Sequence, residues 1–413
     1  MIGFVLADLR RHWAASLVIA LIVALATALG VAITLEERAL RLGTARAADA
    51  FDLVIGAPGS ETQLVLSAVF LQPAPLPLMP GDVLARLAKD PRVVFAAPVA
   101  FGDSYLGAPL IGTTTNLFTA AGQADVVQGR LFERLDEAVL GAASPLGIGD
   151  SIVPMHGQAE EGGHAHGHVR YRVVGRRAAT GTVWDKAIFV PVEAVWQIHG
   201  LGKHHDEAEG EAHDPDDPDL ARPIPTDTLT KADSPGLPAI LVKPKSIADA
   251  YRLRGEYRKG PGTMATFPGE VLTRLYGTLG DIRMILAAVA AGAQGLVAAA
   301  IALVAIVHVA QRRRQIGALR AFGAPRHAIF GIVWLELFAL AGAGIAAGYG
   351  IGFGAARLLA TSLTAQSGIV LPVTIEGADL WAGFALMAGA ALVSGLPAAL
   401  AWREPAAAAL RNG

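Results

Sequence analysis

Four long apolar segments constrain this chain more than any other feature of its sequence. They cover residues 13–35, 284–307, 329–356 and 380–402, and each carries at most one charged residue. A helix needs roughly 20 apolar residues to cross the hydrocarbon core of a bilayer, so each segment is long enough to span a membrane. Only 17% of the chain is charged, whereas about a quarter of the residues of a typical soluble domain are charged. The sequence therefore predicts a membrane protein.

The first apolar segment is longer than the apolar core of a secretory signal peptide. Its uncharged run from Trp13 to Leu35 exceeds the roughly 7–15 residues of such a core. No clean small-x-small cleavage site precedes the polar residues that follow. We therefore expect a retained membrane helix.

Arginine and lysine mark the cytoplasmic side of a membrane protein, because short loops rich in them are retained there. The link at 308–328 holds five arginines and no acidic residue, whereas the link at 361–379 has no lysine or arginine. Arginines also lie before the first apolar segment and after the last one; they are Arg10, Arg11, Arg403 and Arg411. We expect both termini and the 308–328 link to be cytoplasmic, and residues 36–280 to be exported. Since the chain has no cysteine, the exported domain must be held by its own core rather than by disulfides.

The expected fold class is a membrane α-helical bundle of four transmembrane helices, with a large α+β exported (periplasmic) domain inserted between spans 1 and 2. The expected divisions are residues 1–35 for a cytoplasmic amphipathic helix and the first span, 36–280 for the exported domain, 281–310 for the second span, 311–328 for a cytoplasmic elbow, 329–360 for the third span, 361–379 for a short external loop, 380–402 for the fourth span and 403–413 for a cytoplasmic tail. The expected location is the cytoplasmic (inner) membrane of a bacterium.

The exported domain is expected to mix strands and helices. The stretches "VRYRVVGR" and "KAIFVPV" flank a Thr-Gly-Thr sequence and predict a β-hairpin. We expect two subdomains, at 50–145 and 146–245. Helices are predicted at 81–89, 192–198 and 245–258. No Ser-His-Asp set or carboxylate pair has a spacing that suggests catalysis, so an enzyme is not expected.

The elbow and the spans beside it resemble a known family. The stretch "QRRRQIGALRAFGAPRHAIFGIVWLELFALAGAGIAAG" (311–348) resembles the signature of the FtsX/MacB-type permeases of ABC transporters. The ending "REPAAAALR" (403–411) is similar to the usual close of that family, and "LADLRRHWAASLVIALIVALATALGVAI" looks like its amphipathic first helix and first span. Within the exported domain, residues 51–70 and 175–200 look like one subgroup of these permeases, although "LQPAPLPLMPGD" departs from that pattern.

The resemblance implies a permease subunit that works with a separate ABC-type ATPase. The chain lacks the Gly-x-x-x-x-Gly-Lys-Ser/Thr loop that cradles phosphates. We therefore expect no directly bound cofactor, with ATP and Mg²⁺ carried by the partner. In the elbow, apolar residues at i, i+3 and i+6 give a short helix one apolar side, and a Gly-Ala-Pro sequence ends it. The residues expected to contact the ATPase are Arg312, Arg313, Arg314, Ile316, Leu319, Arg320, Phe322, Gly323 and Pro325. A simpler role for these arginines is to anchor the chain at an anionic lipid leaflet.

Two polar residues lie inside the predicted spans. A carboxylate at membrane depth faces protein or water, so we interpret Glu336 as the partner of an elbow arginine or of a backbone N–H group, rather than as part of a proton relay. Gln294 suits a hydrogen bond between helices. Four helices leave no room for a polar pore, so we expect a homodimer over two ATPase subunits, with a heterodimer of paralogues as the alternative.

Histidines gather in two stretches of the exported domain. The tracts at 156–168 and 199–219 contain eight of the eleven histidines, and the second adds eight acidic residues. Imidazole and carboxylate together suit zinc, copper or nickel. The candidate metal ligands are His156, His164, His166, His168, His199, His204, His205 and His213. We expect these loops to sense or collect a divalent ion, most of all zinc, or to dock a partner; the alternative is a solvated loop that binds metal only incidentally.

Three classes of function remain. The first is a permease whose exported domain transmits mechanical work, in divalent-metal handling or in the release or export of lipids, lipoproteins or peptides. The second is a non-transporting regulator of the FtsX kind, and the third is a membrane-anchored receptor without an ATPase. The elbow disfavours the receptor, and an exported domain of about 245 residues favours the first class, by analogy between folds. Expected partners are the ATPase, a second copy of the chain, membrane lipid and an exported metal-binding protein or lipoprotein, but no nucleic acid.

Overall fold

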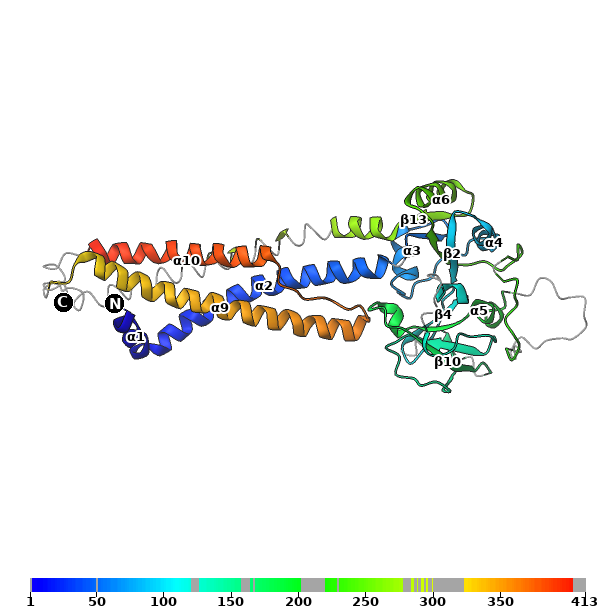
Figure 1. Ribbon diagram of the computed structural model, residues 1–413, viewed down its shortest axis with the longest axis horizontal. Helices are drawn as coiled ribbons and strands as arrows, with labels where there is room; N and C mark the ends of the chain where they lie inside the picture. The colour runs from blue at the N-terminus through cyan, green and yellow to red at the C-terminus, as the bar shows by residue number, and fades with distance from the viewer. Residues whose placement is uncertain are drawn as a thin grey trace, which may run out of the picture. The chain divides into compact units, whose positions relative to one another are not determined.

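The chain divides into two compact units. The computed structural model describes residues 2–49, 51–119, 126–156, 164–165, 168–201, 220–228, 230–277 and 323–403, with single positions at 284, 285, 288, 291, 292, 295 and 299. A helical unit contains Met1–Arg41, Thr278–Ser362 and Leu371–Gly413. A sheet unit contains Leu42–Gly277 and Leu363–Val370. Figure 1 shows the labelled elements of both units.

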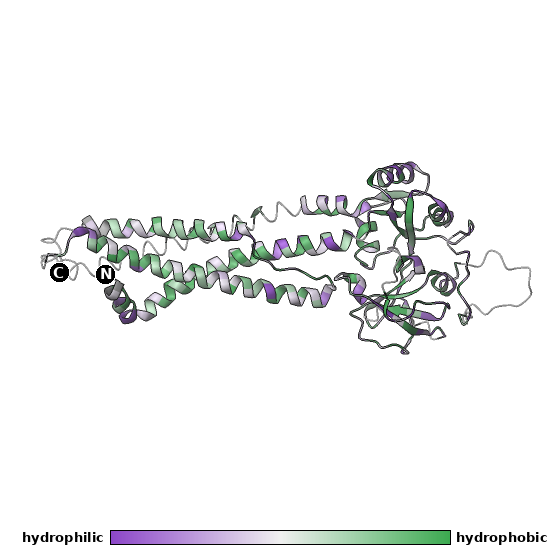
Figure 2. Cartoon of the chain, viewed as in Figure 1, coloured by the Kyte–Doolittle hydropathy of each residue, from purple (hydrophilic) through white to green (hydrophobic). Residues whose placement is uncertain are grey.

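The described part of the helical unit contains one short and three long helices. They are α1 (Ile2–Arg11), α2 (Trp13–Asp49), α9 (Arg326–Ser367) and α10 (Gly377–Arg403). Within the described residues, three helices are long and apolar enough to cross a membrane: α2, α9 and residues Gly377–Ala399 of α10. Figure 2 shows that hydrophobic residues cover most of their length. The predicted second span, 281–310, lies outside the described ranges apart from single positions, so the count of four spans stays a prediction.

Glycines set the distance between α2 and α9. Gly344, Gly348 and Gly352 are spaced four residues apart and therefore share one face of α9. A Cβ atom added to any of them would lie 2.6–2.8 Å from a backbone carbonyl oxygen of α2, those of Ala20, Ala24 and Ala28. These contacts explain why α9 carries glycine at this spacing, since a larger residue would force the two helices apart.

Polar contacts tie α2 and α9 to the start of α10. The Arg38 guanidinium on α2 donates two hydrogen bonds to the Asp379 carboxylate of α10, at 2.7 and 2.9 Å. It also donates to the carbonyl oxygen of Thr374 at 3.1 Å. The Tyr349 hydroxyl of α9 donates to the carbonyl oxygen of Asp379 at 2.7 Å. A bidentate arginine–carboxylate pair of this kind fixes orientation as well as distance.

The first sheet of the sheet unit is antiparallel. Its strand order is β13 (Met264–Thr266), β1 (Leu53–Gly56), β12 (Ala239–Pro244) and β2 (Val93–Val99). Three helices belong with it: α3 (Glu61–Ala68), α4 (Asp82–Lys89) and α6 (Ile247–Lys259). Figure 1 shows α4 beside β2 and α6 beside β13. All four residues of β1 are buried, as expected for a strand covered on both faces.

The second sheet is mixed and holds the strands from the middle of the domain. Its order is β5 (Val126–Gly129), β10 (Tyr171–Arg177), β6 (Glu137–Leu140), β11 (Ile188–Pro191), β4 (Ala108–Thr113), β3 (Asp103–Tyr105), β8 (Met155–His156) and β9 (His164–Ala165), with β7 (Ser151–Ile152) paired to β10. β11 runs parallel to β4 and antiparallel to β6. The helix α5 (Val192–Ile198) follows β11 directly.

The predicted hairpin around Thr180–Thr182 is wrong. β6 lies between β10 and β11, so these two strands do not pair with each other. The Asp185 carboxylate accepts hydrogen bonds from the backbone N–H groups of Thr180 and Gly181, both at 2.8 Å. These bonds fold the Thr-Gly-Thr sequence around Asp185 instead of into a tight hairpin turn, and β11 can then pair elsewhere.

The sheets do not follow the expected subdomains at 50–145 and 146–245. The mixed sheet takes β4 and β6 from before residue 145, and β10 and β11 from after it. The two sheets also share one hydrophobic core, which includes Ile55 and Ile240 of the first sheet and Leu110 and Val190 of the second. The α+β character is as predicted. Of the predicted helices, 192–198 matches α5, whereas 81–89 and 245–258 differ from α4 and α6 by one or two residues at their ends.

Candidate functional site

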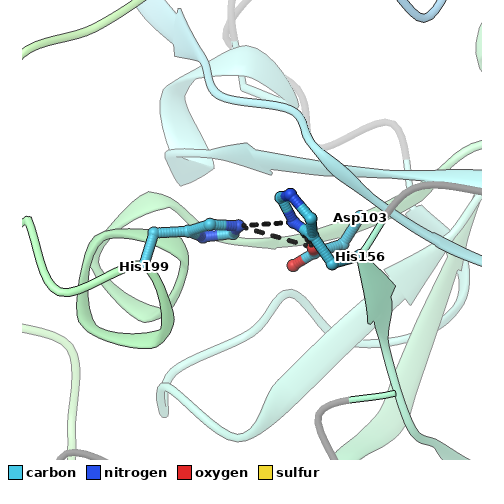
Figure 3. A group of neighbouring side chains, drawn as sticks. All are labelled: Asp103, His156 and His199. Atoms are coloured by element: carbon cyan, nitrogen blue, oxygen red, sulfur yellow. Dashed lines mark hydrogen bonds and ion pairs between the residues drawn. The ribbon is translucent and has the colours of Figure 1, made fainter. Parts of the chain in front are cut away.

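Three side chains from separate elements of the sheet unit converge on one point. They are Asp103 at the start of β3, His156 at the end of β8 and His199 directly after α5. Figure 3 shows both imidazole rings turned toward the Asp103 carboxylate. These residues form a candidate metal centre, because each contributes one nitrogen or oxygen ligand atom and the three atoms lie within 4.8 Å of one another.

Local structure explains how each residue reaches this point. β3 and β8 pair antiparallel with Asp103 opposite His156, so the two side chains leave the sheet on the same face. α5 ends in a Schellman motif, in which the Leu201 N–H donates to the Trp196 carbonyl and the Gly200 N–H to the Gln197 carbonyl. Gly200 has φ +67°, a conformation that glycine adopts without strain. This helix end fixes the backbone of His199.

The distances within the candidate metal centre are short and nearly equal. His156 Nδ1 is 3.2 Å from Asp103 Oδ1, and His199 Nε2 is 3.4 Å from the same oxygen. The two nitrogens are 3.3 Å apart. The Asp103 side chain is 4% exposed, that of His199 22% and that of His156 55%. The group therefore has a buried carboxylate at its base and opens toward solvent at His156.

A backbone hydrogen bond fixes the tautomer of His199. Its Nδ1 lies 2.9 Å from the carbonyl oxygen of Val195. A carbonyl oxygen only accepts hydrogen bonds, so Nδ1 carries a proton and Nε2 is the nitrogen that faces Asp103 and His156. The Asp103 carboxylate, through this contact, raises the pKa of the His199 imidazole above its ordinary value, against the effect of burial.

The candidate metal centre lies where the two histidine tracts begin. His156 is the first residue of the tract at 156–168, and His199 is the first of the tract at 199–219. The structure therefore brings together two of the predicted ligands that are 43 residues apart. The backbone of His164 pairs with His156 in the β8–β9 ladder, and His168 is exposed in a turn outside the cluster. His166, His204, His205 and His213 lie outside the described residues.

Asp103 was not predicted as a ligand. It lies 53 residues before His156 in the sequence "FGDSYLG", which carries no recognisable metal-binding pattern. Only the pairing of β3 with β8 brings it to the histidines. A buried acid of this kind cannot be recognised as a ligand from the sequence without that pairing.

Most of the predicted coupling elbow lies outside the described residues. These positions are Arg312, Arg313, Arg314, Ile316, Leu319, Arg320 and Phe322, together with Gln294 of the second span. Gly323 is described and has φ +91°, and α9 starts directly after Pro325. Glu336 is buried, with 8% of its surface exposed, as expected for a carboxylate inside a span.

The last turn of α9 lies within the sheet unit. The Lys186 ammonium donates to the carbonyl oxygens of Ala365 and Gln366, at 2.5 and 2.9 Å. The Val370 N–H donates to the carbonyl oxygen of Gly181 at 2.9 Å. At Gly368, with φ +80°, an added Cβ would lie 3.3 Å from the backbone of Val183. We call Lys186, Gly181 and their partners in 365–370 the α9 anchor.

Three of the described helices are long and apolar enough to cross a membrane, and the sheet unit forms a separate compact unit. Together they define the class as a multi-span membrane protein with a folded domain outside the apolar helices. Residues 287–404 match the model of one family, the FtsX-like permease C-terminal domain. The match confirms the resemblance to FtsX/MacB-type permeases that the sequence shows at 311–348. No match to the chain was found among curated proteins.

Proposed function

We propose that this chain is the permease subunit of an ABC transporter of the mechanotransmission type. It would couple a separate cytoplasmic ATPase to its own exported domain. The observation that carries the proposal is α9, a single helix. Its first residues follow Gly323–Pro325, near the end of the predicted elbow, and its last turn is held in the sheet unit by the α9 anchor.

The length of α9 suits a mechanical connection. Its 42 residues correspond to about 63 Å at about 1.5 Å per residue, roughly twice the 30 Å thickness of a bilayer core. The helix therefore has residues to spare outside the membrane. Because its backbone groups are hydrogen-bonded along the axis except at the two ends, an axial displacement at one end is carried to the other.

The chemistry of the α9 anchor suits transmission of force. A helix C-terminus carries a partial negative charge, and a lysine ammonium placed there is attracted to it. Lys186 is the last residue before Ala187 and β11, and the carbonyl oxygens that it binds belong to α9. A displacement of α9 would thus act directly on the start of a buried strand of the mixed sheet.

The rest of the proposal follows the family match. The permease would sit in the bacterial inner membrane with both termini cytoplasmic, pair with a second copy, and leave ATP and Mg²⁺ to the ATPase. The histidine tracts and the candidate metal centre support a role in divalent-metal handling, with zinc as the favoured ion. Release of lipids, lipoproteins or peptides is the alternative substrate class.

The proposal is tested by purification with the partner and by substitutions in the elbow. An ATPase encoded beside the gene should co-purify with the permease, and the permease should stimulate its ATP hydrolysis. The double variant Arg320→Glu, Gly323→Pro should insert normally yet lose that stimulation, because it reverses a charge and breaks the turn at the expected contact: Gly323 has φ +91°, whereas proline fixes φ at about −65°. Unchanged stimulation in this variant would contradict the coupling role of the elbow. Stimulation without any metal-dependent phenotype would contradict the role in metal handling and leave the two alternatives, release of lipids, lipoproteins or peptides and a regulator of the FtsX kind.

A further inference from the structure

The candidate metal centre has the donor set of a transition-metal site rather than of a calcium or magnesium site. Two of its three ligand atoms are imidazole nitrogens and the third is a carboxylate oxygen. Imidazole suits zinc, copper and nickel, whereas magnesium and calcium prefer oxygen ligands alone. The chemistry therefore points to zinc or a close neighbour.

The spacing of the three atoms matches tetrahedral coordination. In a zinc site with bonds of about 2.0–2.1 Å, neighbouring ligand atoms are about 3.3–3.4 Å apart, since the edge of a tetrahedron is about 1.63 times its centre-to-corner distance. The three separations observed between Asp103 Oδ1, His156 Nδ1 and His199 Nε2 are 3.2, 3.3 and 3.4 Å. They form a nearly equilateral triangle of the size of one tetrahedral face. A single ion above this face can contact all three atoms without rearrangement of the backbone.

The surroundings also prepare His199 to bind a metal. Metal-binding histidines usually donate their second ring N–H to a carbonyl or carboxylate, which leaves the other nitrogen free of hydrogen and correctly oriented. The bond from His199 Nδ1 to the Val195 carbonyl oxygen, at 2.9 Å, has this role. Asp103 is held by β3 and its side chain is buried, so its oxygen is fixed in place before an ion arrives.

We propose that Asp103, His156 and His199 form a zinc-binding site that ties β3 and β8 to the C-terminal end of α5. This inference rests on the divalent-metal part of the proposed function and makes it specific. The ion is held by ordered residues at the start of both histidine tracts, rather than by the tracts alone. A fourth ligand from solvent or from another side chain completes the tetrahedron.

The test uses the full-length permease, purified in detergent without its ATPase, and Zn²⁺ as the probe. Binding by the tracts is first removed in a parent variant, in which His164, His166, His168, His204, His205 and His213 are replaced by alanine. We expect this parent to retain one Zn²⁺ per chain in a competition titration against a chromogenic chelator. With Co²⁺ it should show the strong visible absorption that distinguishes tetrahedral from octahedral coordination.

Single substitutions in the parent then identify the ligands. His199→Ala, His156→Ala and Asp103→Asn should each weaken Zn²⁺ binding by more than roughly 100-fold, the upper end of the loss seen when only an outer partner of a ligand is removed. His327→Ala, an exposed histidine of the helical unit, should leave binding unchanged. Asp103 is buried, so thermal unfolding without metal is used to show whether the Asp103→Asn variant still folds. If it does not fold, the His156→Ala and His199→Ala variants decide the test.

Two results would overturn the site. One is a parent that binds no Zn²⁺ at micromolar concentration, and the other is a His199→Ala or His156→Ala variant that binds as the parent does. Neither result depends on the ATPase. Loss of ATPase stimulation with intact zinc binding would count against the coupling proposal alone, whereas intact stimulation without zinc binding would count against this site alone.

Discussion

Gly348 is the residue of α9 with the least room for a side chain on the α2 face. An added Cβ would lie 2.6 Å from both the Ala24 carbonyl oxygen and Thr27 Cβ. Neither atom can rotate away, because one belongs to the backbone and the other is a Cβ atom. Helix association in a membrane depends on such close packing, because apolar side chains gain little by leaving lipid for one another.

Gly348→Leu should therefore separate α2 from α9. We expect a loss of stability of about 1–3 kcal/mol, the usual cost of overpacking, measured as a lower unfolding temperature of the detergent-solubilised permease. Gly350→Leu is the matched control, because an added Cβ there meets no described atom within 4 Å. Equal effects of the two substitutions would contradict the packing explanation.

The candidate site shows what single residues reveal in the sequence and what they do not. His156 and His199 could be predicted as ligands because histidine is uncommon and clusters in two tracts. Asp103 could not be predicted, because acidic residues are common and its partners come from strand pairing. The same limit applies to the glycines: their abundance was evident, but only the helix contacts show that Gly344, Gly348 and Gly352 face α2, whereas Gly350 does not.

At the scale of elements, the α9 anchor is the feature with the most direct consequence. Lys186 holds the C-terminal carbonyl groups of a 42-residue helix. A lysine at such a position contributes about 0.3–1 kcal/mol through the helix dipole. Its loss should free the last turn without unfolding the helix.

Lys186→Met should raise the rate of amide hydrogen exchange in residues 363–370 by about two- to fivefold, which corresponds to that range of free energy. It should also reduce any ATP-driven change in exchange within β11. Lys259→Met, at the exposed end of α6, is the control. Exchange at 363–370 that is the same in both variants would show that Lys186 does not hold α9.

Helices and strands differed in how well the sequence predicted them. The long helices were evident, because an uninterrupted apolar run leaves few alternatives. The hairpin prediction failed because two neighbouring strand patterns say nothing about a third strand that enters between them. β6 comes from about 30 residues earlier in the chain, and the hydrogen bonds of Asp185 that favour this arrangement are not visible as a local pattern.

At the scale of the whole molecule, the absence of cysteine makes the predicted topology simple to test. Single cysteines can be introduced without background labelling. Ile247 is 79% exposed in the sheet unit, and Arg11 is exposed at the end of α1. The charge distribution predicts that these two positions lie on opposite sides of the membrane.

Ile247→Cys should react with a membrane-impermeant maleimide in intact cells whose outer membrane is permeabilised, and Arg11→Cys only after lysis. The ratio of labelling before and after lysis is the measurement. Labelling of Arg11→Cys in intact cells, or protection of Ile247→Cys, would reverse the proposed orientation. A parallel experiment with cysteines at 361–379 would establish on which side of the membrane these residues lie.

One stretch of chain connects the α9 anchor with the candidate metal centre. From Lys186 it continues through β11 and α5 to His199, and both elements are largely buried. Thermodynamic linkage then sets a reciprocal condition. If an ion at His199 favours one position of α9 by a given factor, that position of α9 must strengthen binding of the ion by the same factor. A nucleotide cycle that moves α9 between two positions would in that case also alternate the affinity of the exported domain for its ion.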